Sequence, residues 1–224
     1  MAQIITPKNF DANMINYADV KKNSMGGNMV YLSYGEEKQR MTLQTPEMSA
    51  PFGVSTFTDD KTGAVKYSID CSFRGMNDDP KLKLFSEKMQ DFDKMMVNTA
   101  VKNSKEWFGK KMTKEVVEEL YRPIVKPAKD PEKYAPTMKM KIRNIDTVEV
   151  YDHNKNAVTS EKLVKGSKLK SIIECSSIWF VNKSFGVSWN LVQVLMSIPD
   201  KVSGFSIKED SDDDEEYEEV EVLE

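Results

Sequence analysis

A short run of alternating cationic and apolar residues is the clearest chemical feature of this sequence. It covers residues 137–143, where Lys139, Lys141 and Arg143 occupy every second position. In a β-strand these three cations share one face, because successive side chains point to opposite sides of the sheet. Their spacing of about 7 Å along the strand matches phosphates along an extended single strand of nucleic acid. The alternative is a solvated face on a half-buried strand.

Further cations could belong to the same surface. Lys168 and Lys170 repeat the alternation on a later predicted strand. Arg40, Lys66 and Lys183 lie beside aromatic runs. There they could contact phosphate groups, or they could be ordinary surface residues.

Aromatic residues near these cations could supply platforms for nucleobases. Every base has a π-face, so stacking is worth roughly 1–3 kcal/mol per base whatever the sequence. Trp179 and its neighbour Phe180 point to opposite faces of a strand, so at most one of them belongs to the core. Most aromatic residues are expected to be structural. The candidates for stacking are Tyr31, Tyr34, Tyr67, Trp179 and Trp189.

The net charge of −4 conceals a division of the chain into a basic body and an acidic tail. Residues 208–224 contain eleven acids and one lysine, which leaves 25 acids and 31 bases in residues 1–207. The body therefore carries about +6 and the tail about −10, so the body can attract a polyanion and the tail can imitate one. The densest part of the tail consists of Asp212, Asp213, Asp214, Glu215, Glu216, Tyr217, Glu218 and Glu219.

The composition of the tail predicts disorder. A disordered acidic segment tethered to a basic surface has an effective concentration on the order of millimolar. It would compete with weakly bound strands, and after displacement by long ones it would be free to recruit a basic partner. A merely solubilising terminus is the alternative.

Hydrophobic periodicity predicts short strands interrupted by helices. A helix is expected from Asp78-Asp79-Pro80 to about residue 101, since an acidic cap and a proline in the first turn are helix-start signals. Its apolar stripe, taken as core, is Leu82, Phe85, Met89, Phe92 and Met96. A shorter helix is expected at residues 113–121. The predicted strands are residues 29–34, 39–44, 52–58, 65–73, 137–143, 148–151, 168–181 and 185–197, the second ending at Thr45-Pro46.

This order of elements predicts a mainly β fold: an OB-fold-like antiparallel barrel with a helical insertion. We expect an N-terminal extension at residues 1–25 and a DNA-binding domain at residues 26–204. The insertion falls at about residues 79–121. A disordered acidic tail is expected at residues 205–224.

Signals for other classes of protein are weak. The two cysteines, Cys71 and Cys175, lie in apolar runs and are expected to be reduced core thiols, and with the single His153 they do not suggest a metal site. The sequence lacks the common phosphate-loop, dinucleotide and nucleophile-elbow motifs. We therefore expect no enzyme, no catalytic residue and no cofactor. Neither a membrane span nor a secretory signal is predicted.

Five short blocks occur in order along the chain: residues 43–46, 50–54, 103–109, 134–139 and 178–189. Together they resemble the single-stranded DNA-binding proteins of nucleocytoplasmic large DNA viruses. These proteins are similar to a podovirus-type phage single-stranded DNA-binding protein, which has an OB-fold, an added helix and an acidic C-terminal tail. The resemblance covers about residues 30–197 and the tail.

The resemblance implies an intracellular protein at viral replication sites, in the cytoplasm or nucleus of the host. It implies a role in DNA replication, recombination or repair. It also implies tail contacts with a replicative polymerase or helicase, and it is compatible with a homodimer. One feature departs from the phage pattern: that tail ends in an aromatic residue, whereas this one ends Val222-Leu223-Glu224.

Two hypotheses therefore compete. The first is a sequence-independent single-stranded DNA-binding protein. The second is an acidic-tailed chaperone or structural protein that binds basic protein partners.

Overall fold

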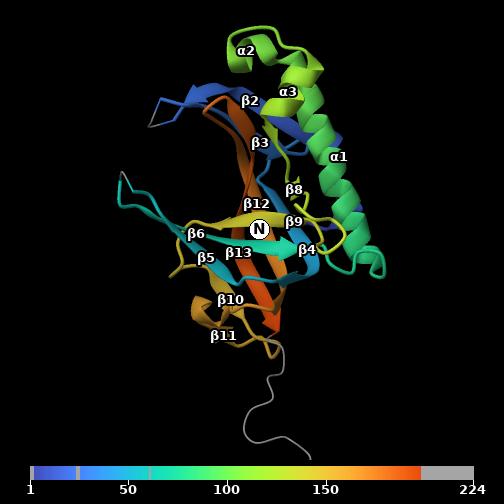
Figure 1. Cartoon of the computed structure of the whole chain (residues 1–224), viewed down its shortest axis with the longest axis vertical. Helices are drawn as coiled ribbons and strands as arrows, with labels where there is room; N and C mark the ends of the chain where they lie inside the picture. Colours follow the sequence, from blue (N-terminus) through green and yellow to red (C-terminus); the bar gives the residue numbers. More distant parts are fainter. Residues whose placement is uncertain (1–2, 24–25, 61, 198–224) are drawn as a thin grey trace, which may run out of the picture.

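The computed structural model describes residues 3–23, 26–60 and 62–197, which are mainly β with a few helices (Figure 1). The α-helices of this part are α1 (Pro80–Lys102), α2 (Ser104–Phe108) and α3 (Lys114–Leu120). The strands up to α1 are β1 (Ile4–Ile5), β2 (Ile15–Lys22), β3 (Asn28–Tyr34), β4 (Met41–Ala50), β5 (Val54–Thr58) and β6 (Val65–Ser72). The later strands are β7 (Tyr121–Arg122), β8 (Val125–Lys126), β9 (Thr137–Ile142), β10 (Glu149–Tyr151), β11 (Ala157–Val158), β12 (Ser167–Val181) and β13 (Ser184–Ser197).

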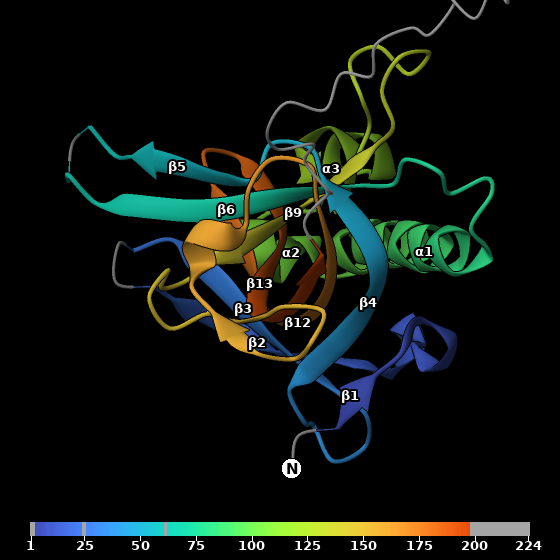
Figure 2. The same ribbon diagram turned by 90° about the horizontal axis from the view of Figure 1, so that it is seen from below.

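Five strands pair in a closed ring, in the order β4-β6-β9-β13-β12 and back to β4. Seen from below, β4 curves beside β12 and β13 (Figure 2). Among the described residues, two strand pairs of the ring are very short: β4 and β6 pair only at Ser49 and Ser72, and β9 and β13 pair only at Lys141 and Asn190. Most strand pairs are antiparallel, as predicted, but β9–β13, β10–β13, β7–β13 and β1–β4 are parallel pairs.

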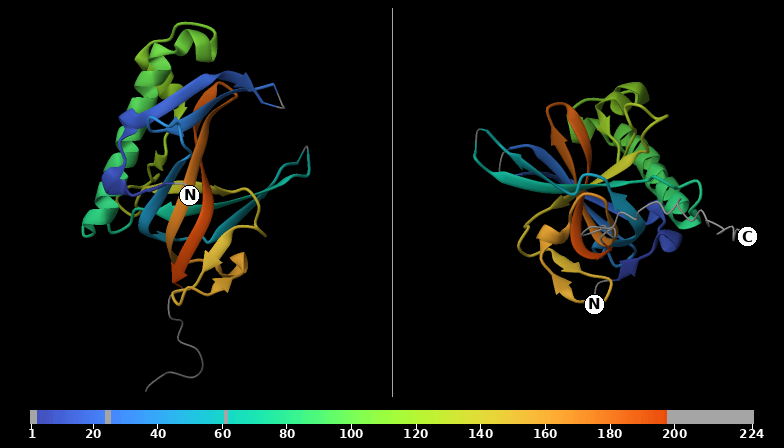
Figure 3. Two further views of the ribbon diagram at one scale, coloured as in Figure 1. Left: turned by 180° about the vertical axis from the view of Figure 1, so that it is seen from behind. Right: turned by 60° about the horizontal axis from the view of Figure 1, so that its bottom comes forward.

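The β2–β3 hairpin extends the sheet beside β12. The described part of the predicted N-terminal extension thus contributes strands, and its Phe10 is buried against Tyr34 and Phe92. Weak patterning in β2 follows from its place at the edge of the sheet, where its residues are mostly exposed or half-buried. The β2–β3 and β5–β6 hairpins both project from the side opposite α1 (Figures 1 and 3).

The strand β4 continues through Pro46, contrary to the prediction that it ends there. Proline lacks the N–H that a ladder needs. The pairing of β4 with β12 is irregular at this point, between Lys170 and Ile172. There the hydroxyl of Thr45 accepts a hydrogen bond from the Ser171 N–H at 3.0 Å, so a side chain replaces a backbone acceptor.

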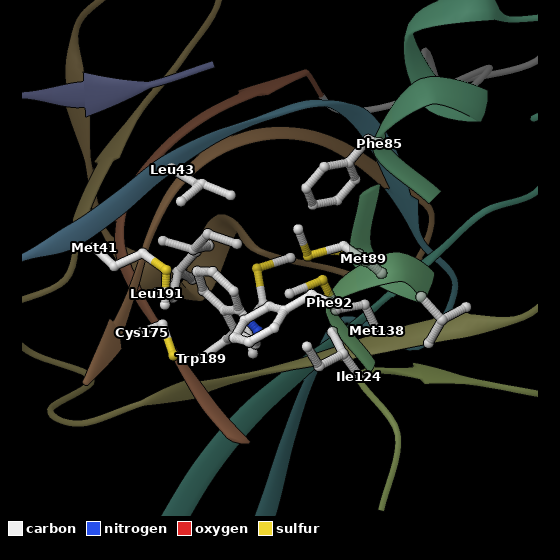
Figure 4. Close-up of a cluster of buried hydrophobic side chains, with 14 of the residues drawn as sticks. Met41, Leu43, Phe85, Met89, Phe92, Ile124, Met138, Cys175, Trp189 and Leu191 are labelled. Atoms are coloured by element: carbon white, nitrogen blue, oxygen red, sulfur yellow. The ribbon is translucent and has the colours of Figure 1, made fainter. Parts of the chain in front are cut away.

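The helix α1 covers one side of the ring, and its predicted apolar stripe is buried as expected. Its first turn is capped by Asp79, whose carboxylate accepts from the N–H groups of Lys81 and Leu82. Figure 4 shows Phe85, Met89 and Phe92 meeting side chains from the strands in one core. Both cysteines are buried free thiols, and burial raises the pKa of Cys71 to about 12. No helix of the described chain is long and apolar enough to cross a membrane.

Candidate nucleic-acid interface

A continuous row of polar side chains crosses six strands on the outer face of the sheet. Directly paired residues place their side chains on the same face. Ser55 of β5 pairs with Ser68 of β6, which pairs with Lys141 of β9. The Lys141 ammonium donates a hydrogen bond to the Ser188 hydroxyl of β13 at 2.8 Å.

The second half of the row continues from β13 to β3. Ser188 pairs with Ser177 of β12, and Ser177 pairs with Tyr31 of β3. The row therefore makes five steps between neighbouring strands, or about 24 Å at about 4.8 Å per step. We call this set, Ser55, Ser68, Lys141, Ser188, Ser177 and Tyr31, the cross-strand row.

Two arginines that are far apart in the sequence meet beside the row. Arg40 and Arg143 lie 3.6 Å and 3.4 Å from the two carboxylate oxygens of Glu174. The Glu174 side chain is only 14% exposed, whereas both arginine side chains are more than half exposed. One carboxylate thus holds two guanidinium groups, whose remaining N–H donors are available to an anion.

Lysines border the row on both sides. Lys139 pairs with Asp70 at 3.6 Å, and Lys66 with Asp59 at 3.6 Å. Burial, followed by the nearby charge of Lys66, lowers the pKa of Lys141. The row and its borders contain more cations than acids, which favours an anionic ligand. The cations are Lys21, Arg40, Lys66, Lys139, Lys141 and Arg143, and the acids are Asp59, Asp70 and Glu174.

Aromatic rings stand next to the row. Tyr31 is 45% exposed, and the Lys21 ammonium lies 5.8 Å from its ring centroid. Trp179 is half-buried two residues beyond Ser177, on the same face of β12, and pairs with Gly186. A Cβ on Gly186 would lie 2.8 Å from Cζ2 of Trp179, so the indole ring rests on a position where only glycine leaves space.

The β5–β6 hairpin adds an exposed ring at the end of the row. Phe57 is 61% exposed and pairs directly with Lys66. The two side chains therefore share one face of the hairpin. An aromatic ring beside a cation is the combination that binding of single-stranded nucleic acid uses.

The structure brings together several of the residues predicted from the sequence. Lys139, Lys141 and Arg143 alternate with buried Met138, Met140 and Ile142, so the predicted alternation of exposed cations and buried apolar residues is confirmed, while binding by these cations stays a prediction. The members assembled at the row are Tyr31, Arg40, Lys66, Lys139, Lys141, Arg143 and Trp179.

Other predicted residues lie elsewhere. Lys170 precedes Ser177 by seven residues on β12, which is about 23 Å of strand, and Lys168 pairs with Glu47 at 3.6 Å. Lys183 occupies the β12–β13 turn. The predicted tail contacts, residues 212–219, lie outside the described residues.

Three predicted aromatic contacts need correction. Trp189 is 2% exposed and packs edge-on against Phe92 in the core, so it has no face for a base (Figure 4). Tyr34 stacks on Phe10, and its hydroxyl accepts from the Asp11 N–H, so it holds the N-terminal segment. Tyr67 pairs with buried Ile142, and its ring therefore points away from the row.

The serines of the row, Lys21 and Phe57 are functional candidates that sequence reasoning missed. Single serines carry no pattern of their own. The β12–β13 turn, however, has only two residues between the paired Val181 and Ser184. Counting back from this turn would have aligned Ser177 with Ser188. In the described residues no group of three His, Cys, Asp or Glu side chains is placed to hold a metal ion.

Comparison with known proteins supplies a family. Residues 75–209 match the model of a family of unknown function, DUF5871, and this match covers more than half of the 224 residues. The chain belongs to DUF5871. The match includes β9, β12 and β13 of the cross-strand row of this DUF5871 protein. A search of curated proteins finds no match.

Two solved structures are similar to the DUF5871 protein. One is the single-stranded DNA-binding protein of bacteriophage Enc34 in complex with ssDNA: 12% identity, 83% of this chain and 98% of that chain covered, TM-score 0.41. The other is gp2.5, a single-stranded DNA-binding protein encoded by bacteriophage T7: 14% identity, 75% and 97% covered, TM-score 0.46.

Proposed function

We propose that the DUF5871 protein binds single-stranded DNA, without regard to sequence, along the cross-strand row. The observation that carries this proposal is the row itself, in which six strands align hydroxyls, a lysine and an exposed tyrosine, with arginines and lysines at the borders. Serine hydroxyls and cations contact phosphates, which confers affinity but no sequence preference.

A single strand fits the surface better than a duplex. Stacking on the rings of Tyr31, Trp179 and Phe57 requires an unpaired base that can leave its own stack, and only a single strand offers one. We further propose that the closed ring is an OB-fold-like barrel. In that fold the face of the second and third strands binds oligonucleotides. Here those strands are β6 and β9, which carry Lys66, Ser68, Lys139 and Lys141.

The biological setting belongs to the same proposal. We propose DNA replication, recombination or repair in a nucleocytoplasmic large DNA virus, inside the host cell, as the resemblance implies. Polymerase or helicase contacts through the tail, and a homodimer, are further parts of it. The alternative of a chaperone for basic proteins rests on the acidic tail alone, whereas the cross-strand row favours a polyanion.

The direct test is a titration of fluorescein-labelled oligo-dT, followed by anisotropy at several salt concentrations, with a duplex of equal length as the comparison. We expect tighter binding of the single strand and a negative slope of log K against log salt, about 0.7 per phosphate contact. Absence of oligo-dT binding at low salt would exclude the proposed function.

Deletion of residues 208–224 is expected to tighten binding to short oligonucleotides. The deleted segment carries eleven acids, and a tethered polyanion competes for a basic surface. The gain should shrink with long strands and at high salt, where the tail is displaced or screened. Equal or weaker binding by the deleted protein in the same anisotropy assay would show that the tail does not compete.

Lys141 should make binding sensitive to alkaline pH. Its pKa is lowered, first by burial and then by Lys66, so it loses its proton below the usual lysine value of about 10.4. Affinity for oligo-dT should therefore fall as pH rises, and Lys141→Arg should postpone the fall because guanidinium stays charged. Identical pH profiles for the two proteins at constant salt would contradict a role for this ammonium group.

A further inference from the structure

A cavity of about 600 Å³ lies between α3 and the β12–β13 turn, near α2. One wall is aromatic, made by Phe108 and Phe180. The other wall is aliphatic: Val116 and Leu120 lie one turn apart on α3, and Met112 precedes the helix. Val116 is 42% exposed and Val181 of the turn is 54% exposed, so apolar surface faces solvent here.

The cavity lies at the end of the β12–β13 hairpin, mainly on the side of the sheet opposite the cross-strand row. Val181 and its partner Ser184, which by alternation belong to the face of the row, line the cavity where the hairpin turns. Successive residues of a strand point to opposite faces. Trp179, Met29 and Lys21 are on the face of the row, whereas Phe180, Asn28 and Lys22 line the cavity. Phe180 stacks on Phe185, and both touch Phe108 of α2, which confirms this orientation. A ligand in the cavity would therefore leave the row free.

Lysines surround the mouth of the cavity. Its lining includes Lys22, Lys110 and Lys183 and, among the described residues, no aspartate or glutamate. Lys22 is held in place: its ammonium donates to the Asn28 side-chain oxygen at 2.6 Å, and the Asn28 amide donates to the Trp107 carbonyl at 3.0 Å. An anionic ligand with an apolar body matches this combination of lysines and apolar walls.

Protein side chains suit the walls better than a nucleotide does. Val116 and Leu120 of α3, with Met112 just before the helix, make up what we call the α3 wall, and such flexible aliphatic surface is typical of grooves that receive amphipathic helices. A nucleic acid on the row would have to pass around the β12–β13 turn to reach this cavity. The chemistry therefore favours a peptide with leucine- or phenylalanine-like side chains and carboxylates.

We propose that this cavity binds an acidic amphipathic helix of a partner protein while DNA occupies the row. The apolar side chains of the helix pack against the α3 wall and Phe180. Its carboxylates face Lys22, Lys110 and Lys183. Simultaneous binding rests on the proposed DNA function, whereas docking of the helix itself goes beyond that function and can be measured without DNA.

The test uses the full chain and a fluorescein-labelled synthetic peptide of about 15 residues, roughly four helical turns, made of leucine, phenylalanine and glutamate in amphipathic order. The same peptide with lysine in place of glutamate is the charge control. We expect the acidic peptide to bind and the basic one not to bind. Saturating oligo-dT should leave peptide affinity unchanged within about twofold.

Two variants locate the site. Lys22→Glu, Lys110→Glu and Lys183→Glu together should weaken peptide binding at least about tenfold, since three attractive charges become repulsive. The matched control, Lys81→Glu, Lys83→Glu and Lys102→Glu on α1, makes the same charge change away from the cavity. Val116→Asp with Val181→Asp alters exposed residues only, so it should abolish docking without unfolding the chain.

Three results would overturn the proposal. Equal binding of the basic peptide would remove the role of charge, and displacement of the peptide by oligo-dT would assign the cavity to nucleic acid. A peptide of residues 208–224 that displaces the probe at lower concentration than the unlabelled probe does would assign it to the chain's own C-terminus. Since oligo-dT affinity is measured in the same titrations, a failed docking site remains distinguishable from a failed DNA site.

Discussion

Replacing Lys66 and Lys141 together with alanine is expected to weaken oligo-dT binding about 25-fold in 0.1 M salt. For a single strand, each phosphate contact contributes about 0.7 to the slope of log K against log salt. Taking 1 M salt as the reference, one contact therefore raises the binding constant roughly fivefold in 0.1 M salt. The salt slope should accordingly become shallower by about 1.4. The two lysines lie on neighbouring strands of the row, close enough that the charge of Lys66 lowers the pKa of Lys141.

The matched control is Lys168→Ala with Lys170→Ala. It removes the same net charge from the other end of β12, where the structure places these lysines beside β4 and away from the row. We expect less than about a threefold loss and an unchanged slope, since only contacted phosphates release counterions. Equal losses for the two pairs would mean that overall charge, and not the row, determines affinity.

Trp179→Ala is expected to weaken binding by about 1–3 kcal/mol, or roughly 5- to 150-fold, with no change in the salt slope. Stacking on a base involves no counterion, so its loss should be equal at low and high salt. Trp179→Phe should retain most of the affinity. A loss that disappears at high salt would show that the variant disturbs phosphate contacts instead of stacking.

Fluorescence gives an independent measure of the same contact. Of the three tryptophans, Trp107 and Trp189 are 3% and 2% exposed, so quenching by oligo-dT should come from Trp179. Quenching should disappear in Trp179→Phe although binding persists. Gly186→Ala should also reduce the quenching, because the added Cβ would meet both the Trp179 indole and the Arg122 carbonyl and displace the ring.

Local patterns predicted from the sequence agree well with the structure where one strand or helix suffices. The alternation around Lys139 and Lys141 and the buried stripe of α1 follow from periods of two and 3.6 residues, which depend on nearest neighbours only. The face of Trp179 did not follow in this way. Along β12 the core-facing residues have odd numbers up to Cys175. A register shift between Cys175 and Ser177 then reverses the two faces, so that Ile178 points into the core and Trp179 points outward.

That register shift is a β-bulge in effect, and its extra residue is Ser176. A second shift, between Ile172 and Ile173, leaves Val192 of β13 without a partner and restores the alignment of the two strands. Neither Ser176 nor Val192 is a residue type that predicts a bulge from the sequence. The convergence of Arg40 and Arg143 on Glu174 was likewise beyond sequence reasoning, because it depends on the pairing of β12 with β4 and on closure of the ring.

The β12–β13 turn places a charged residue in an unfavourable backbone conformation. Both of its central residues, Asn182 and Lys183, have positive φ values, 48° and 64°. Asparagine adopts this conformation readily, but at the second position glycine is the usual choice, and a lysine there costs about 1 kcal/mol or more. Lys183 thus destabilises its own hairpin while it lines the cavity beside α3. Lys183→Gly would therefore stabilise the hairpin, but it would also remove one of the lysines that line the cavity.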